Sequence, residues 1–376
     1  MHPGDYVFIQ FGINDGAENK PERYISVEDY KKLITDKYIG EVEKRGGTPV
    51  LMTANAAAWW DEENNCFMES RKDYADPTRE IAEETGCKFI DENKIVTDAW
   101  NSMSKNRVLS GYFICEPLES KAYPSGTNDT THMKAKGAKR VAKLIADAIP
   151  ENVPELAKYL KGDETFTDIQ GHWAEDVIKT LAENDKVSGV GDGKFNPDGT
   201  VTRAEFLKMA MDSLGIVGHA YRDGECLDAT NDDWYCYYLQ GALDKDIIPE
   251  EMIEDCDFTN VTKTLKESTE KEKAVRANVN VYTGKFYGDK PITREEMAVI
   301  ATRCKNYKMR NWRDWDNERR IPVFSFKDSD EIDEKYISYV VHAYNLKYID
   351  GMEDGRFAPK ENLTRAQAAV VMNNLK

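Results

Sequence analysis

Two short motifs in the first 150 residues carry side chains suited to acyl transfer. An aspartate and a histidine stand three residues apart in Asp129-Thr130-Thr131-His132, and on a loop such a pair can serve as orienter and general base for a serine nucleophile. Asn14 follows an apolar run at 6–11, and its side-chain amide can donate to an oxyanion. Each motif also has a plain structural interpretation: His132 as a solvated histidine after a turn, and Asn14 as an ordinary turn residue.

A Thr-Arg motif recurs three times in the rest of the chain. Thr202 and Glu205, with equivalents at 293–296 and 364–367, fit the capping box of a helix start. The arginine after each threonine falls in the first helical turn, where the helix dipole disfavours a cation. A guanidinium at a helix N-terminus can bind a carboxylate or phosphate, whereas the alternative is pairing with acidic residues of the same repeat. These arginines are Arg203, Arg294 and Arg365.

The first 150 residues alternate apolar runs with helical patterns. Runs at 6–11, 49–52 and 87–90 predict strands, and patterns at 26–45, before Gly86, at 93–107 and at 134–149 predict helices. This alternation predicts a parallel sheet with helices on both faces. Ligands of such sheets bind at the C-terminal ends of the strands. Because both acyl-transfer motifs belong at that edge, each strengthens the interpretation of the other.

Pro150 and Pro154 mark a change to helices and turns with an internal repeat. A glycine-rich turn at 189–197 and its gapless equivalent at 351–359 each lead into a Thr-Arg motif, whereas the middle copy keeps only 291–296. Insertions at about 250–290 and 307–322 enlarge the middle of the region. The Asp-Gly turns lack the regular oxygen ladder of a calcium loop, so plain turns are the better interpretation.

The composition excludes several classes of protein. The length of 376 residues predicts two or three domains, and the net charge of -17 argues against a nucleic-acid partner. No apolar stretch approaches the ~20 residues of a membrane helix, and no signal peptide is visible. The seven cysteines form no C-x-x-C pair, so we expect neither zinc nor a disulfide framework but mostly buried thiols. No metal or cofactor is expected.

The repeated region resembles the S-layer homology family. The resemblance rests on Phe166-Thr-Asp-Ile-Gln-Gly-His-Trp-Ala, Phe195-Asn-Pro and Thr202-Arg-Ala-Glu, and it covers three copies over about 166–376. It implies an all-α, three-fold domain that binds anionic, pyruvylated secondary cell-wall polysaccharide. The third copy has Tyr336 where the first two have tryptophan, and the second lacks the glycine-rich turn. The implied groove residues are Arg203, Arg294, Arg365, Trp173, Trp234 and Asp168.

The first 150 residues look like the SGNH (GDSL-type) hydrolase family, and most of all like rhamnogalacturonan acetylesterase-like carbohydrate esterases. The resemblance rests on the stretch 3–15 and on Asp129-x-x-His132-x-x-x-x-Gly137-Ala138. It implies a flavodoxin-like α/β sheet, with Asn14 in the oxyanion hole, His132 as general base and Asp129 as its orienter. It also makes Gly12 the tight-turn residue before Asn14 and requires no cofactor.

The Gly-Asp-Ser motif that carries the nucleophile in that family is absent. In the family this motif and an oxyanion glycine precede the Asn14 strand. We therefore expect a sheet without its first strands, a nucleophile outside this sequence, and a chain that is inactive alone; a genuine pseudo-enzyme is the alternative. The serines of this part lie in expected caps or loops: Ser26, Ser70, Ser102, Ser104, Ser110, Ser120 and Ser125.

Together these observations predict an extracellular carbohydrate O-acetylesterase that acts on acetylated polysaccharide and is held at the cell wall or S-layer by its repeats. The alternative is a non-catalytic wall-binding protein with an inert hydrolase remnant. Trp59 and Trp60 either stack on sugar or are buried. The expected organisation is a hydrolase domain at 1–150, a linker at 151–165, and repeats at 166–216, 217–307 and 323–376.

Overall fold

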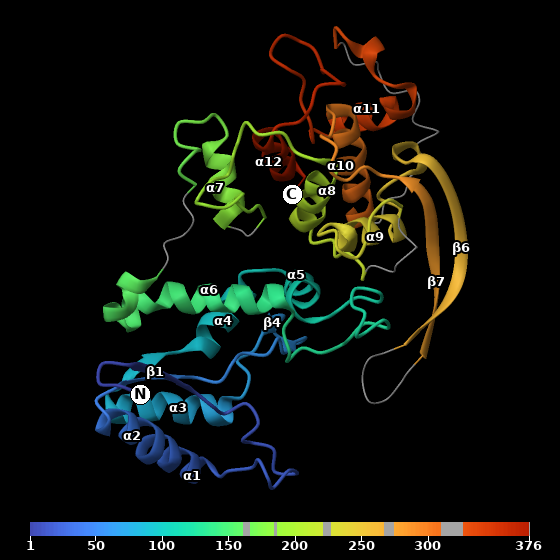
Figure 1. Cartoon of the computed structure of the whole chain (residues 1–376). Coiled ribbons are helices and arrows are strands. Elements are labelled where there is room, and N and C mark those ends of the chain that lie inside the picture. Colours follow the sequence, from blue (N-terminus) through green and yellow to red (C-terminus); the bar gives the residue numbers. More distant parts are fainter. Residues whose placement is uncertain (161–165, 184–185, 221–226, 267–273, 310–325, 376) are drawn as a thin grey trace. The chain divides into compact units, whose positions relative to one another are not determined.

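The computed structural model describes residues 1–160, 166–183, 186–220, 227–266, 274–309 and 326–375. Most of the expected insertion at 307–322, Cys226 and residues 161–165 of the expected linker lie outside them. The chain forms two compact units, Met1–Cys115 with Thr127–Lys161, and Glu116–Gly126 with Gly162–Lys376 (Figure 1). No helix among these residues is long and apolar enough to span a membrane.

A three-stranded parallel sheet forms the centre of the N-terminal unit. The strand order is β1-β2-β5, with Tyr6 opposite Thr48 and Val50 opposite Lys88. Successive side chains point to opposite faces, so Leu51 joins a core under one layer of helices while Val50 and Met52 join a core under the other. Burial on both faces explains the nearly continuous apolar runs. The strands are β1 (Tyr6–Gln10), β2 (Thr48–Met52) and β5 (Lys88–Ile90).

Helices cover both faces of this sheet, as the alternation predicted. Helices α1 to α3 contribute to the core on one face, and α4 and α6 to the core on the other (Figure 1). The predicted helix at 93–107 is divided, because α4 ends at Asn101 and Ser104 caps a separate short helix. The helices are α1 (Val27–Lys32), the π-helical η1 (Leu33–Ile39), α2 (Gly40–Lys44), α3 (Lys72–Thr85), α4 (Glu92–Asn101), α5 (Lys105–Val108), the π-helical η2 (Leu109–Phe113), α6 (Ala135–Asn152) and the 3₁₀ turn η3 (Pro154–Tyr159).

Strand β1 lies at one edge of the described sheet. It pairs with β2 alone, and Phe8 and Phe11 are exposed although the run that contains them is apolar. The parallel α/β arrangement is therefore present in three strands. The fuller flavodoxin-like strand order, and a sheet that lacks its first strands, stay predictions. A small antiparallel ribbon, β3 (Trp60–Asp61) with β4 (Cys66–Phe67), lies in the loop after β2.

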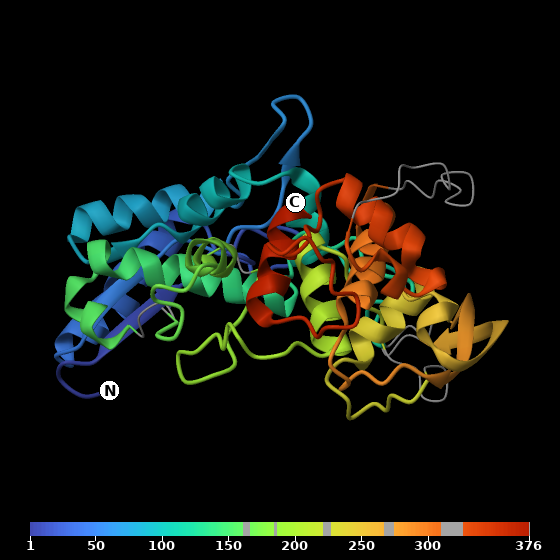
Figure 2. The same cartoon turned by 90° about the horizontal axis from the view of Figure 1, so that it is seen from above.

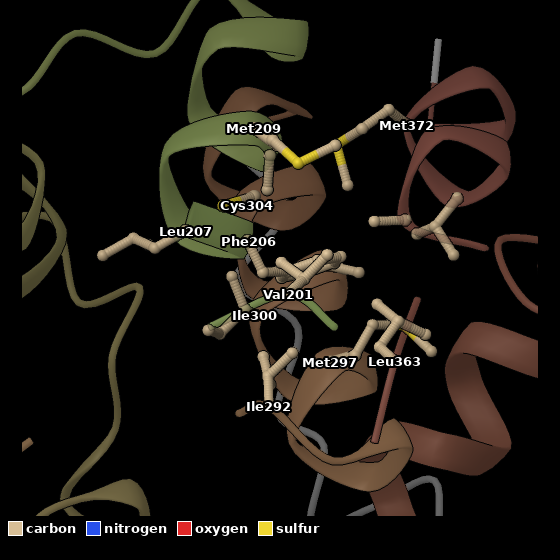
Figure 3. Close-up of a cluster of buried hydrophobic side chains, with 14 of the residues drawn as sticks. Val201, Phe206, Leu207, Met209, Ile292, Met297, Ile300, Cys304, Leu363 and Met372 are labelled. Atoms are coloured by element: carbon tan, nitrogen blue, oxygen red, sulfur yellow. The ribbon is translucent and has the colours of Figure 1, made fainter. Parts of the chain in front are cut away.

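Three helices of equivalent sequence surround the core of the C-terminal unit. Side chains of α8, α10 and α12, with Val201, Ile292 and Leu363 just before them, form this core (Figure 3). The predicted capping boxes are confirmed, since Thr202, Thr293 and Thr364 each accept from the backbone three residues on. The helices are α7 (Glu175–Glu183), α8 (Arg203–Leu214), α9 (Cys236–Asp244), α10 (Arg294–Met309), α11 (Ile337–Asn345) and α12 (Arg365–Asn374), with the 3₁₀ turns η4 (Glu250–Met252), η6 (Ser329–Glu331) and η7 (Glu334–Tyr336).

The three repeats close into a ring through backbone hydrogen bonds. Val201 N donates to Leu363 O at 2.9 Å, Leu363 N to Ile292 O at 3.0 Å, and Ile292 N to Val201 O at 2.9 Å. All three residues are fully buried, and a buried backbone group needs a partner. The first repeat is thereby bonded to both the second and the third, and its helix α8 packs beside α10 and α12 (Figure 2).

The prediction that the C-terminal unit is all-α is wrong. The insertion in the second repeat contains an antiparallel hairpin of β6 (Glu254–Lys266) and β7 (Ala274–Lys285), with Asn260 opposite Asn280. Its sequence alternates β-branched and polar residues, which favours strands. The expectation of mostly buried thiols is also wrong, because Cys304 alone is buried among the described cysteines.

Candidate active site and wall-binding surface

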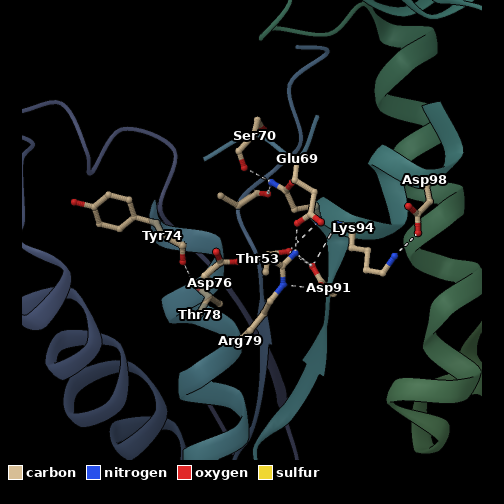
Figure 4. Close-up of polar contacts among 12 residues, drawn as sticks. Thr53, Glu69, Ser70, Tyr74, Asp76, Thr78, Arg79, Asp91, Lys94 and Asp98 are labelled. Atoms are coloured by element: carbon tan, nitrogen blue, oxygen red, sulfur yellow. Dashed lines mark hydrogen bonds and ion pairs between the residues drawn. The ribbon is translucent and has the colours of Figure 1, made fainter. Parts of the chain in front are cut away.

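A polar network fixes the segment that follows β2. Arg79 binds Asp91 through two hydrogen bonds of 2.8 and 3.0 Å and also pairs with Glu69 (Figure 4). Thr53 Oγ1 donates to Asp91 Oδ1 at 3.1 Å and accepts from the backbone of Asn93 at 2.9 Å. Because charge-assisted, bidentate contacts are strong, this network ties the C-terminal ends of β2 and β5 together.

Two buried side chains then hold residues 54–58 in an extended course. The Asn93 amide donates to Ala54 O and Ser70 O, both at 2.9 Å. Ser70 Oγ accepts from the backbone N–H of Ala57 at 2.9 Å. Ser70 is fully buried, so it acts as a structural acceptor here and is a poor candidate for a nucleophile.

The Asp129–His132 loop is attached to this segment. Ala58 N donates to Thr130 O at 2.8 Å. Asp129 accepts the backbone N–H of Thr131 at 2.7 Å and of His132 at 2.9 Å, and its second oxygen lies 2.7 Å from His132 Nδ1. The side chain of His132 is 87% exposed. The aspartate is thus held by the backbone while the imidazole faces solvent.

The charge of Asp129 determines which ring nitrogen of the histidine is free. Burial raises the pKa of Asp129, but the hydrogen bonds from the backbone and ring of His132 and from Thr131 outweigh it, so this pKa lies below its ordinary value. An ionised carboxylate is an acceptor only, so the proton of a neutral His132 resides on Nδ1. Nε2 then has a free lone pair, as a general base requires.

Asn14 lies in a turn at the C-terminal end of β1. Gly12 adopts φ +100° there, and an added Cβ would lie 2.9 Å from Tyr74 Cβ, so a side chain at position 12 is excluded. Gly12 N donates to Asp15 Oδ2 at 3.0 Å, and the Tyr74 hydroxyl donates to Asp15 O at 3.0 Å. Asn14 itself is exposed. Strands β1 and β2 are parallel neighbours, so Asn14 and the segment that carries the histidine loop follow the same edge of the sheet.

A buried carboxyl at this edge was not recognised in the sequence. Glu92 follows β5 and is 2% exposed, and the Gln10 amide donates to it and to Thr53 O. Burial raises the pKa of Glu92 to about 7, although the Gln10 contact lowers it in part. No sequence pattern identified this carboxyl, because its partner Gln10 is an exposed residue at the end of β1 and the two are 82 positions apart.

The three recurrent arginines are buried at the contacts between repeats. Arg294 donates to Phe357 O at 2.7 Å and Asp350 O at 2.9 Å, and Arg365 donates to Phe195 O at 2.7 Å and Ser188 O at 2.9 Å. Arg203 donates to Phe286 O at 2.6 Å and pairs with Glu296. Each therefore reaches into the next repeat around the ring, so the pairing within one repeat that was considered as the alternative is not observed. Polymer binding by these arginines stays a prediction.

Each guanidinium also lies over a phenylalanine of the next repeat. The distances from Cζ to the ring centroid are 5.8 Å for Phe286, 5.1 Å for Phe357 and 4.8 Å for Phe195. Phe286 shows that the second copy retains Gly-Lys-Phe at 284–286, although it replaces the following Asn-Pro with Tyr-Gly and the preceding Gly-Asp with Tyr-Thr. The expectation that the middle copy keeps only 291–296 is therefore wrong in part.

The other predicted groove residues divide into structural and exposed ones. Asp168 accepts the backbone N–H groups of Phe195 and Asn196 at 2.9 and 2.7 Å, so it supports the turn. Trp173 and Trp234 are 66% and 53% exposed. In the third repeat Tyr336 is buried and precedes α11 as Tyr235 precedes α9. The equivalent of the tryptophans is therefore Lys335 and not Tyr336.

The chain joins two kinds of protein that are each recognisable in comparisons. The S-layer homology domain family matches residues 165–207, 279–298 and 325–369. The C-terminal part therefore carries S-layer homology repeats. The N-terminal part is homologous to esterases of the rhamnogalacturonan acetylesterase type.

The individual relatives match one part each. The probable rhamnogalacturonan acetylesterase YesY of Bacillus subtilis is 31% identical over 151 residues, which are 40% of this chain and 64% of that protein. The amylopullulanase of Thermoanaerobacterium thermosulfurigenes is 33% identical over 213 residues, 57% of this chain and 10% of that protein. The crystal structure of the protein YxiM of Bacillus subtilis is 26% identical in sequence to this chain where the two are matched. The match covers 42% of this chain and 38% of that one, with a TM-score of 0.31.

Proposed function

We propose that the N-terminal unit belongs to a carbohydrate O-acetylesterase that acts on an acetylated polysaccharide such as rhamnogalacturonan. The observation that carries the proposal is the 2.7 Å contact between Asp129 and an exposed His132, with the aspartate fixed by two backbone N–H groups. The similarity to an acetylesterase over 151 residues supports it.

In this mechanism His132 Nε2 removes the proton of a serine hydroxyl, and the serine oxygen attacks the acetyl carbonyl. Asp129 keeps the imidazole in the required tautomer and stabilises the imidazolium that forms. The Asn14 amide donates to the oxyanion of the tetrahedral intermediate. As the tetrahedral intermediate collapses, the bond between the acetyl carbon and the sugar oxygen breaks and His132 gives its proton to that oxygen, which leaves as a hydroxyl. His132 then removes a proton from water, which attacks the acetyl-serine and releases acetate and the free serine.

As part of this proposal, the serine nucleophile of the reaction is not among residues 1–376. Ser26 and Ser104 cap helices and Ser70 is buried, which supports that part. The test is acetate release from acetylated rhamnogalacturonan by residues 1–376 and by the longest in-frame product that ends at Lys376. We expect release from a longer product that supplies a Gly-Asp-Ser strand and none from 1–376. Turnover by 1–376 that a serine substitution abolishes would refute the assignment, and inactivity of every product would favour a non-catalytic wall-binding protein.

We further propose that the S-layer homology repeats hold the protein at the cell surface by binding an anionic secondary cell-wall polysaccharide. The exposed Trp173 and Trp234 support this proposal, since large exposed aromatic side chains mark binding surfaces. The test is co-sedimentation with purified cell-wall polysaccharide. We expect Trp173→Ala with Trp234→Ala to abolish it, while Tyr159→Ala, at an exposed tyrosine of the N-terminal unit, leaves it unchanged.

A further inference from the structure

An exposed tryptophan and an unpartnered guanidinium lie close to the Asp129–His132 loop. Trp59 is 37% exposed, and Arg71 Cζ lies 5.2 Å from the centroid of its ring. Arg71 Nε is buried and has no acceptor, and among the described residues its side chain forms no hydrogen bond or ion pair. A buried donor without an acceptor is costly, which is the condition expected of a site that a ligand completes.

The backbone places this pair beside the proposed catalytic loop. Ala57 N is bonded to the side chain of Ser70, and Arg71 is the next residue. Ala58 N is bonded to Thr130 O, and Trp59 is the next residue. His132 is two residues from Thr130, a reach of roughly 7 Å along the chain. Neighbouring sugar rings of one polysaccharide can therefore span from Trp59 to the histidine.

The backbone at Arg71 is strained in the conformation that presents the guanidinium. Its φ of +59° is left-handed, which is uncommon for a residue other than glycine. It also precedes the N-terminus of α3, where the helix dipole disfavours a cation. Such strain persists where the surroundings enforce it and is frequent at ligand sites. The adjacent Trp60 differs, because it packs on Phe67 and donates to Glu62.

We propose that Trp59 and Arg71 form a subsite for a uronate residue of the acetylated polysaccharide; its place in a substrate site rests on the proposed esterase function. The indole offers an apolar surface to the C–H face of a pyranose ring. The guanidinium binds the C6 carboxylate, because its planar donors match a carboxylate in geometry and charge. The chain carries a net charge of -17 and repels a polyuronate in general, so a local cation is required to hold an acidic sugar.

The test follows Trp59 directly in the full chain, independently of acetate release. All seven tryptophans are labelled with 5-fluorotryptophan, and Trp59→Phe assigns the Trp59 resonance by ¹⁹F NMR. The probes are trigalacturonate and its methyl ester, which has the same rings without the charges. The variants are Arg71→Gln and Arg71→Lys, and Arg107→Gln is the control at an exposed arginine of the same unit.

We expect trigalacturonate to shift the Trp59 resonance in the unaltered chain and in Arg107→Gln. In Arg71→Gln the apparent affinity should fall roughly tenfold or more, and Arg71→Lys should lie between. In the unaltered chain the methyl ester should bind roughly tenfold or more weakly than the acid, a comparison that needs no folded variant. Equal affinity for acid and ester, or a Trp59 resonance that neither probe moves, would overturn the subsite. Acetate release by a longer, active product without an Arg71-dependent shift would refute the subsite alone. The shift without acetate release by any product, including the longer ones, would refute the esterase alone.

Discussion

Replacing Glu92 with glutamine should stabilise the N-terminal unit at pH 8 and have little such effect at pH 5. The pKa of this buried carboxyl is raised from 4.5 to about 7. The folded chain therefore binds more protons than the unfolded chain between these values. The stability that Glu92 contributes is complete below pH 4.5 and is lost as the pH rises through 7, because the fold must then hold a buried carboxylate.

The magnitude follows from the two pKa values. The separation of the two pKa values corresponds to a loss of about 3 kcal/mol of folding stability at pH 8, whereas less than about 1 kcal/mol has been lost at pH 5. Glutamine has no such titration, and its side-chain oxygen can still accept from Gln10. The variant should therefore gain about 2–3 kcal/mol relative to the parent between pH 5 and pH 8.

Peptide-resolved hydrogen exchange over residues 88–101 measures this difference at the site. Comparison at the same pH cancels the intrinsic exchange rate. We expect Glu92→Gln to slow exchange by roughly 10²-fold at pH 8 and by only a few-fold at pH 5. Glu83→Gln, at an exposed position of α3, is the control and should change neither. A ratio of variant to parent exchange that is the same at both pH values would refute the burial argument.

The remaining predictions concern the turn at Asn14, the ring of repeats and the catalytic residues. Gly12→Ala should cost about 1–3 kcal/mol in thermal unfolding, because its Cβ would clash with Tyr74; Gly111→Ala, where nothing lies within 4 Å, should cost nothing. Arg365→Ala should cost about 2–4 kcal/mol in denaturant unfolding, because two carbonyls of the first repeat lose their donor; Arg356→Ala, at a largely solvated surface ion pair, should have little effect, and equal effects would contradict the role assigned to the ring contacts. Asn14→Ala and His132→Ala should leave the melting temperature within the equivalent of about 0.5 kcal/mol, while Asn14→Ala lowers kcat of an active, longer product by roughly 10²–10³; a melting temperature that falls with activity would indicate a structural role.

Features governed by local rules were predictable from the sequence. The parallel strands followed from apolar runs covered on both faces, and the capping boxes from threonine with glutamate or glutamine three residues on. The aspartate–histidine contact also lies within one short loop. In the capping boxes and the aspartate–histidine loop the interacting groups are within a few residues of one another, and each strand is recognisable from its own apolar run, so the local pattern contains the geometry.

Features that depend on distant partners were not predictable in the same way. The first-turn arginines suggested an anion site, but Arg365 finds its acceptors 170 residues away in sequence. The misassignment of Tyr336 has a different cause. Five residues lie between Asp168 and Ala174, and seven lie between Asp328 and Tyr336, so the loop lengths differ and hide the helix register. Only the start of α11 shows that Lys335 replaces the tryptophans.

The closed ring of repeats determines when the contacts of the first repeat can form during synthesis. In a linear repeat array each new unit can dock on the one before it. Here the arginine that caps the turn of the first repeat is translated 170 residues after Phe195, which takes roughly 10–30 s at common elongation rates. During that interval the carbonyl groups of Ser188 and Phe195 in the nascent first repeat lack their donor, and the Phe195 ring lacks the guanidinium that lies over it. The first repeat can therefore complete its contacts only after the third repeat has been made.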